Sequence, residues 1–353
     1  MPNIAIIGTT SWGITLGVVL ARNGTQVRLW ARTEQEALAL SNDGSNLTQT
    51  SGVEFPPELS VTTSLSEALD GVSAVILVVP SQNIRWNIKL LAEHLDESML
   101  IVSAAKGLEV GSNKRMSQVI ADEIEHDLRH NICVLSGPNL APEILANLPA
   151  ATVVAAADEA IARKAQKLLT TPQLCVFTNT DVVGVELGGA LKNIIALGAG
   201  IADGLGYGDN TKAALITRGL TEMTALGIHL GANPLTFSGL AGLGDLIATC
   251  ASPLSRNHYV GVELAKGRSL KEITDSMTGV AEGVSTTLVV WNLARQMGLA
   301  MPITEAIFRV LYEGADLHQA ASELMSAGAA HELAGRKWKL FDFIRRRRHS
   351  SVS

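Results

Sequence analysis

The sequence predicts an α/β protein with an N-terminal doubly wound, mostly parallel sheet, followed by an all-helical domain. Short apolar runs alternate with helical segments up to about residue 180, which is typical of βαβ units whose sheet is covered on both faces. After that point come long segments of small and apolar residues, punctuated by Gly and Pro, which favours helices. A glycine-containing loop between the first strand and the first helix is the third observation.

The individual elements follow from these runs and their boundaries. Strands are expected over residues 4–7, 26–30, 75–79, 100–103, 132–135, 152–156 and 175–178. A helix over residues 14–23 ends at Gly24, a natural C-cap, and further helices are expected over 182–202, 212–229, 280–296 and 303–313. We therefore predict a dinucleotide-type sheet domain over 1–180 and a helical substrate-binding domain over 181–340. Residues 341–353, which include four consecutive arginines, are expected to be a disordered basic tail.

Composition excludes several classes of protein. The chain has 353 residues, 47% of them hydrophobic and 18% charged, which is enough for two cores. A net charge of -6 gives no general affinity for nucleic acid. The three cysteines have no metal-ligand spacing, so we expect no metal site and a reducing compartment. No signal peptide and no apolar run of about 18 residues is visible, so we expect a soluble, cytoplasmic protein without a membrane span.

The loop GTTSWG, residues 8–13, predicts a dinucleotide site. It follows the first strand and opens the first helix, which is the context of the Rossmann fingerprint. Gly8 suits the tight turn and Gly13 suits close packing of helix on strand, while the helix N-terminus attracts a pyrophosphate. Thr10 replaces the middle glycine of the fingerprint, so its hydroxyl must turn toward the phosphates or binding must weaken.

The tip of the second strand bears on the choice of cofactor. It carries Arg32 and no carboxylate, although Glu34 lies slightly beyond and can partly serve the ribose. Because a guanidinium matches phosphate geometry, Arg32 favours NADPH over NADH, or at least tolerates NADPH. A surface arginine in a loop is the alternative. Lys106, just past a buried strand, can face an anionic ligand, and the loop after the next strand, with Gly137 and Asn139, adds donors near the nicotinamide.

The second half carries the reactive groups. Lys192 and Asn193 stand side by side in the apolar run ELGGALKN, residues 186–193, where a structural helix has no use for them. Downstream, Asp245 lies in GLGDL and Arg256 in the run SRN, residues 255–257. Such a set suits a small anionic substrate that reacts at a hydroxyl or carbonyl carbon, with Lys192 as acid and base. The alternatives are a snorkelling lysine, an Asp245 that caps a helix, and a surface Arg256.

The runs GTTSWG, AAKGLE, SGPNLA, ELGGALKN, GLGDLIATC, SRN and VAEG occur in one order over about residues 3–315. In these runs the chain resembles the bacterial NAD(P)-dependent glycerol-3-phosphate dehydrogenases. The resemblance implies reversible reduction of dihydroxyacetone phosphate, a small phosphorylated substrate, to sn-glycerol 3-phosphate, which supplies phospholipid synthesis. It also implies NADPH or NADH as cofactor, a Rossmann domain before a helical domain, and a homodimer.

Position by position, Lys192 matches the family's proton donor and acceptor. The substrate positions, with Asn193 added from its place on the helix, are Lys106, Gly137, Asn139, Lys192, Asn193, Asp245, Ser255, Arg256 and Asn257. The cofactor positions, with the two loop glycines, are Gly8, Ser11, Trp12, Gly13, Arg32, Lys106, Ala141, Arg256, Val280 and Glu282. Three residues depart from the family pattern: Thr10 for glycine, Asn139 for Ser or Thr, and Pro142 for a polar residue.

Two other functions fit the residues alone. One is another Rossmann dehydrogenase with a helical domain, acting on a hydroxy acid or a sugar nucleotide, and the oxidation of a sugar nucleotide to an acid would need a nucleophilic cysteine. Cys250 lies near GLGDL without an adjacent base. The other is a non-catalytic nucleotide-binding sensor, which only Thr10 favours.

Overall fold

The computed structural model describes residues 3–43 and 53–326. The predicted basic tail over 341–353 lies outside these residues. The strands are β1 Asn3–Ile7, β2 Gln26–Trp30, β3 Leu59–Thr62, β4 Ala74–Leu77, β5 Leu100–Ser103, β6 Ile132–Ser136, β7 Ala150–Ala155 and β8 Leu174–Asn179. The helices before the last strand are α1 Ser11–Arg22, α2 Glu34–Asp43, α3 Leu65–Leu69, α4 Ile84–Leu91, α5 Met116–Glu123, α6 Ala141–Leu145 and α7 Glu159–Leu169. Those after it are α8 Val182–Gly204, α9 Asp209–His229, α10 Asp245–Ala251, α11 Arg256–Ala265, α12 Leu270–Ser276, α13 Glu282–Met297, α14 Pro302–Tyr312 and α15 Leu317–Ser326.

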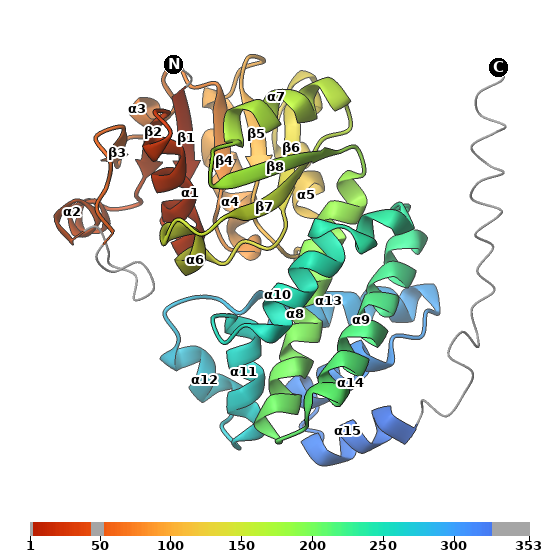
Figure 1. The fold of residues 1–353 in the computed structure, drawn as a ribbon. Coiled ribbons are helices and arrows are strands. Elements are labelled where there is room, and N and C mark those ends of the chain that lie inside the picture. Colours follow the sequence, from red (N-terminus) through yellow and green to blue (C-terminus); the bar gives the residue numbers. More distant parts are fainter. Residues whose placement is uncertain (1–2, 44–52, 327–353) are drawn as a thin grey trace, which may run out of the picture.

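The eight strands form one sheet in the order β3-β2-β1-β4-β5-β6-β7-β8. Neighbouring strands are parallel except for β6 and β7, so the predicted mostly parallel, doubly wound sheet is confirmed. Figure 1 shows the sheet and its helices as one layer system above the helices that follow β8. Strand β3 was not predicted, because this four-residue edge strand buries only Leu59 and Thr62 and carries little apolar signal.

Helices cover both faces of the sheet because strand side chains alternate between them. Ile4 and Ile6 of β1 pack into one core with α1, α6 and α7. Ala5 and Ile7 of the same strand pack into a second core with α3, α4 and α5. The carboxyl ends of the parallel strands remain uncovered by these helices, which is where ligands bind in such sheets.

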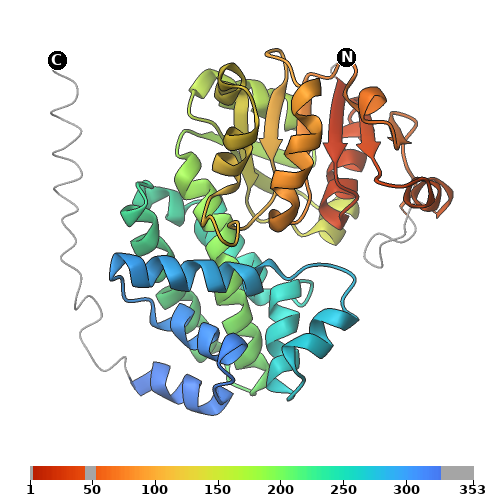
Figure 2. The same ribbon diagram turned by 180° about the vertical axis from the view of Figure 1, so that it is seen from behind.

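The long helix α8 is the centre of the second layer system. It contacts α9, α10, α11, α13 and α14, and Figure 2 shows the blue helices α13 and α14 lying against it from behind. By length and hydropathy α8 could cross a membrane. The prediction of no membrane span did not anticipate this, because it considered only uninterrupted apolar runs. Yet 89% of its apolar window is buried inside the protein, so the central position of α8 in a helical core accounts for its composition.

The N-terminal end of α8 is fixed to the sheet. Val185 of α8 and Ala241 join Val134 of β6 and Val153 of β7 in one small apolar cluster. At the next residue, the buried carboxylate of Glu186 accepts hydrogen bonds from Arg115 and from Ser117 at the start of α5. The helix that carries Lys192 is therefore held in place relative to the strand ends.

A glycine on α8 permits its closest helix crossing. An added Cβ at Gly200 would lie 2.0 Å from the carbonyl oxygen of His258 on α11. We expect Gly200→Ala to lower the free energy of unfolding by about 3 kcal/mol, since the two helices must separate. Urea denaturation would measure it, with Gly208→Ala as the control because a Cβ there meets nothing within 4 Å. Equal midpoints for the two variants would contradict this packing.

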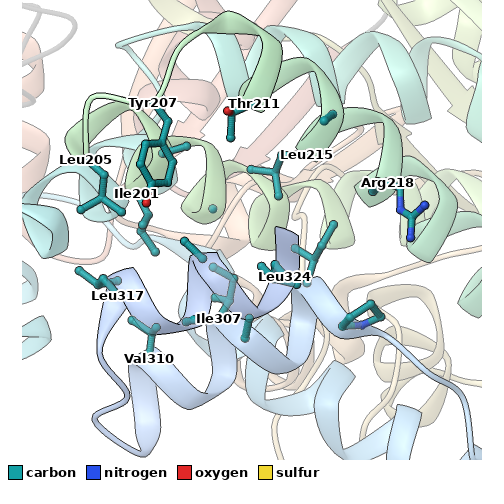
Figure 3. Close-up of a pocket in the computed structure, with 18 of the residues that line it drawn as sticks. Ile201, Leu205, Tyr207, Thr211, Leu215, Arg218, Ile307, Val310, Leu317 and Leu324 are labelled. Carbon is teal, nitrogen blue, oxygen red and sulfur yellow. The ribbon is translucent and has the colours of Figure 1, made fainter. Parts of the chain in front are cut away.

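An apolar cavity of about 170 Å³ lies between α8, α9, α14 and α15 (Figure 3). Leu215, Ile307 and Leu324 line it, with Arg218 toward one end and Tyr207 toward the other. Most of its lining residues are apolar, and none of the predicted reactive residues Lys192, Asp245 and Arg256 is among them. On α8 its first lining residue is Gly198, about 9 Å along the helix from Lys192. The reaction site therefore lies elsewhere in the protein.

Candidate functional site

A polar cleft opens where the carboxyl ends of the strands face the helical domain. It encloses a cavity of about 200 Å³. The N-terminus of α1, the loops after β4 and β5, and the N-terminus of α6 form its sheet side, while α8, α10, α11 and α13 form the other. Twelve predicted site residues line it: Ser11, Trp12, Lys106, Asn139, Ala141, Lys192, Asn193, Ser255, Arg256, Asn257, Val280 and Glu282.

Lys192 reaches the cleft from the middle of α8 with a side chain only 8% exposed. Its Nζ donates to the Asp245 carboxylate and to Thr249 Oγ1 at 2.6 Å. An ammonium has three N–H bonds, so one remains for a substrate oxygen. Burial lowers the pKa of Lys192 from 10.5 to about 8, although the charge of Asp245 opposes the change. The lysine can therefore gain and lose a proton near neutral pH.

Asp245 joins two lysines from different domains. A short π-helical turn over Leu240–Gly244 delivers it to the first position of α10, where it is buried. Besides Lys192 it accepts from Lys106 Nζ at 2.7 Å, and Lys106 also donates to the Gly137 carbonyl at 2.8 Å. Gly137 and Asp245 thus lie behind the cleft lining and act on it through Lys106. The alternative that Asp245 serves as an N-cap is wrong, since the cap position is Gly244.

The side-chain amides of two predicted substrate residues, Asn193 and Asn257, form a hydrogen-bonded chain that extends to a third helix. The Asn193 side-chain oxygen on α8 accepts from Asn257 Nδ2 on α11 at 2.9 Å. Asn257 Oδ1 in turn accepts from the backbone N–H of Gly283 on α13 at 2.9 Å. Ser255 caps α11 by accepting from His258 N–H, so its hydroxyl oxygen supports the helix that presents Arg256.

Arg256 stands between the cleft and a neighbouring recess, because it lines both. The surrounding protein lowers the pKa of Arg256 by desolvation, and the charge of Glu282 opposes this. Burial raises the pKa of Glu282, against hydrogen bonds from Ser81 N–H and Oγ in the loop after β4. Glu282 therefore ties the start of α13 to the sheet domain across the cleft.

The hydrogen bonds of Thr10 in the glycine loop explain how a threonine fits there in place of the glycine. The Thr10 hydroxyl donates to the Val78 carbonyl at 2.8 Å and accepts from Gly13 N–H at 3.1 Å. The hydroxyl therefore caps α1 through bonds within the protein, while Thr10 itself lines the cleft. An added Cβ at Gly13 would lie 2.2 Å from the Gly8 carbonyl oxygen, so the close approach predicted for this glycine is present.

The recess beyond Arg256 has a volume of about 400 Å³. The predicted cofactor residues that line it are Gly8, Ser11, Arg32, Arg256 and Val280. Arg32 is 66% exposed there, and its Nε lies 3.6 Å from Glu36, a residue the sequence analysis did not consider. Glu34, the carboxylate considered for the ribose, instead accepts from Thr63 and does not line the recess.

Two buried polar atoms in the cleft support a bound ligand. Within the described part of the chain, Trp12 Nε1 and Asn139 Oδ1 are buried without a hydrogen-bond partner. Asn139 Nδ2 donates to Thr152 at 3.1 Å, so the amide is oriented with its oxygen unsatisfied. Buried polar groups normally have partners, and both residues line the cleft. Together with the close loop at Gly13, they fit a nicotinamide dinucleotide extending from the recess into the cleft.

Other residues of the site were missed from the sequence. Thr249 stands four residues after Asp245, a spacing that places both on one helix face, and it could have been found from that. Glu186 was read only as part of its run. Ser81 follows the predicted strand over 75–79, and its role was not apparent from the sequence because its partner Glu282 is 201 residues away.

The chemistry of Cys250 disfavours one alternative function. Its thiol is fully buried beneath the cleft, and burial raises its pKa to about 12. Such a thiol stays protonated at neutral pH and is a poor nucleophile. Cys250 therefore cannot serve as the nucleophile that the oxidation of a sugar nucleotide to an acid would need.

The sheet, the glycine loop and the buried lysine next to a polar cleft define a dinucleotide-dependent dehydrogenase of a small anionic substrate. Family models agree: NAD-dependent glycerol-3-phosphate dehydrogenase N-terminus matches residues 3–162, and the C-terminus model matches residues 181–322. The chain belongs to the NAD-dependent glycerol-3-phosphate dehydrogenase family. Its reaction is the reversible reduction of dihydroxyacetone phosphate to sn-glycerol 3-phosphate with NAD(P)H.

Individual relatives are similar over nearly the full length. A Dehalococcoides mccartyi protein named glycerol-3-phosphate dehydrogenase (NAD(P)+) is 63% identical over 99% of this chain and 97% of its own length. A Streptomyces griseus protein of the same name is 49% identical over 93% and 97%. The crystal structure of glycerol-3-phosphate dehydrogenase from Coxiella burnetii superposes with a TM-score of 0.85 at 38% identity, covering 92% of this chain and 98% of that one.

Proposed function

We propose that Lys192 is the proton donor in the reduction of dihydroxyacetone phosphate and the proton acceptor in the reverse direction. The observation that carries this is its buried ammonium, which has two protein partners, one free N–H and a pKa of about 8. When bound, NAD(P)H supplies the hydride to C2. Lys192 polarises the C2 ketone and gives its proton to the oxygen as the alcohol forms.

Asp245 and Lys106 position the acid. Asp245 accepts from both lysines, so it holds the Lys192 amine at one place for either protonation state. Lys106 is anchored by Asp245 and the Gly137 carbonyl and keeps one further N–H bond for a ligand. This arrangement makes Lys106 a positioning residue that also lines the cleft.

The phosphate of the substrate would lie at the start of α11. Arg256 begins this helix and Asn257 follows, so a guanidinium, an amide and the helix N-terminus converge there. Binding energy at the phosphate orients C2 toward Lys192. Ser255 and Asn193 support the arrangement from the cap and from α8.

The dinucleotide would lie along the sheet side. Thr10 occupies the Gly13 N–H, so the N–H groups of Ser11 and Trp12 remain for the pyrophosphate at the N-terminus of α1. Gly8 and Arg32 would lie beside the adenosine, and Asn139, Ala141, Val280 and Glu282 beside the nicotinamide end, where Asn139 has its unsatisfied oxygen.

The pH dependence tests this role of Lys192. Reduction needs the protonated amine, so kcat/KM for dihydroxyacetone phosphate should fall as pH rises through about 8. Oxidation needs the neutral amine, so kcat/KM for glycerol 3-phosphate should rise through the same pH. Initial rates in both directions across this range would measure it. A pair of profiles that bend in the same direction would contradict the assignment.

The setting of the reaction follows from the family resemblance. We infer a cytoplasmic homodimer that feeds glycerol 3-phosphate into glycerophospholipid synthesis, without nucleic-acid partners. The net charge of -6 supports the last point.

A further inference from the structure

The carboxylate of Glu36 lies at the tip of β2 although the residue belongs to α2. Its Oε2 accepts from the backbone N–H of Arg32 at 2.9 Å, directly after the strand. Its Oε1 accepts from the hydroxyl of Thr9 in the glycine loop. One carboxylate therefore bridges the glycine loop and the strand tip, and a side chain 24% exposed leaves its remaining lone pairs accessible.

This position coincides with the ribose side of the dinucleotide recess. Of the described residues that line the recess, Glu36 is the only acidic one, and Arg32 and Arg256 are the cations. In doubly wound sheets a carboxylate at the tip of the second strand accepts the hydroxyls of the adenosine ribose. Here the Glu36 carboxylate reaches the strand tip from α2, four residues after Arg32.

We infer that Glu36 sets the choice between NADH and NADPH, by accepting the ribose hydroxyls of NADH and opposing the 2′-phosphate of NADPH. The inference deepens the proposed function, since it rests on the dinucleotide lying along this recess. Arg32 acts in the opposite sense, because its guanidinium attracts the phosphate from the solvent side. The charges of Arg32 and Glu36 offset each other beside the ribose, which lets the enzyme accept both cofactors and leaves the balance to Glu36.

The charge of the 2′-phosphate explains why Glu36 favours NADH over NADPH. A 2′-phosphate carries more than one negative charge near neutral pH and would stand against a carboxylate fixed by Thr9 and the Arg32 N–H. Glu36 cannot swing away without leaving both donors unpaired. The 2′-hydroxyl, by contrast, donates one hydrogen bond to the same oxygens.

The experiment compares kcat/KM for NADH and NADPH, with saturating dihydroxyacetone phosphate, in the full-length enzyme and in Glu36→Gln. The amide retains the shape and one acceptor but loses the charge. We expect the ratio of NADPH to NADH efficiency to rise at least about tenfold. Arg32→Ala should move the ratio the other way. Glu67→Gln is the matched control, because Glu67 also accepts from a threonine hydroxyl, that of Thr62, outside the recess.

A binding readout separates this inference from the role of Lys192. Trp30 and Trp86 line the recess, so their fluorescence reports titration with NAD+ and NADP+ even in a variant that does not turn over. An equal loss with both dinucleotides would show a merely structural Glu36 and overturn the inference. So would an unchanged ratio, or a shift caused by Glu34→Gln in its place.

Discussion

Lys192→Ala should lower kcat for the reduction of dihydroxyacetone phosphate about 1000-fold while the substrate still binds. The variant loses the amine that Asp245 and Thr249 together hold at the cleft, and loss of a general acid typically costs between about 10² and 10⁴ in rate. Arg256 and Asn257, which would hold the phosphate, are untouched. Steady-state kinetics in both directions, with titration of substrate onto the enzyme–cofactor complex, measure the change.

A second lysine variant controls for the substitution itself. Lys164 is a surface residue that donates to the Ser98 carbonyl, so Lys164→Ala should keep normal kinetics. If Lys192→Ala instead raised KM alone and left kcat intact, Lys192 would be a substrate anchor and the proton would come from another group.

Asp245→Asn should impair both stability and activity. The carboxylate is the shared counterion of Lys106 and Lys192, and removing one partner of a buried ion pair costs about 3–5 kcal/mol. Without that charge, the pKa of Lys192 should fall below about 8, because Asp245 is what opposes its desolvation. The bend in the pH profile of glycerol 3-phosphate oxidation should then move to lower pH.

Asp203 provides a control for the Asp245→Asn variant. Asp203 also bridges two partners, Lys212 and His258, but neither partner lines the cleft, whereas Lys106 and Lys192 do. Asp203→Asn is matched with Asp245→Asn in urea denaturation, and only Asp245→Asn should shift the pH profile. A profile unchanged in Asp245→Asn would mean that this carboxylate does not tune Lys192.

The sequence was informative where chemistry is local. The strand-loop-helix setting of residues 8–13 predicted the glycine turn, and the run around Lys192 predicted a reactive amine on a buried helix. The Asp245 carboxylate and Arg256 guanidinium were expected near it, and the fold brings both there. The long run of small and apolar residues located helix α8, because its apolar character follows from burial on all sides.

The rest depended on contacts between distant segments. Thr10 became interpretable only when β4 placed the Val78 carbonyl beside its hydroxyl. Lys106 was expected to face a ligand, but its ammonium also binds Asp245, 139 residues away. Glu36 was missed because its side chain reaches back from α2 to the strand tip, against the expectation of an acid on the strand itself. The order of β7 and β8 at the sheet edge likewise has no sequence signal.

The most direct test is the single-turnover rate of hydride transfer in wild-type enzyme and Lys192→Ala, each saturated with cofactor and dihydroxyacetone phosphate. Nicotinamide absorbance follows the chemical step without contributions from binding or product release. If Lys192 supplies the proton, the variant should transfer hydride at least about 100-fold more slowly, with its dissociation constants close to those of the wild type. A variant that transfers hydride at the wild-type rate would contradict the proposed mechanism.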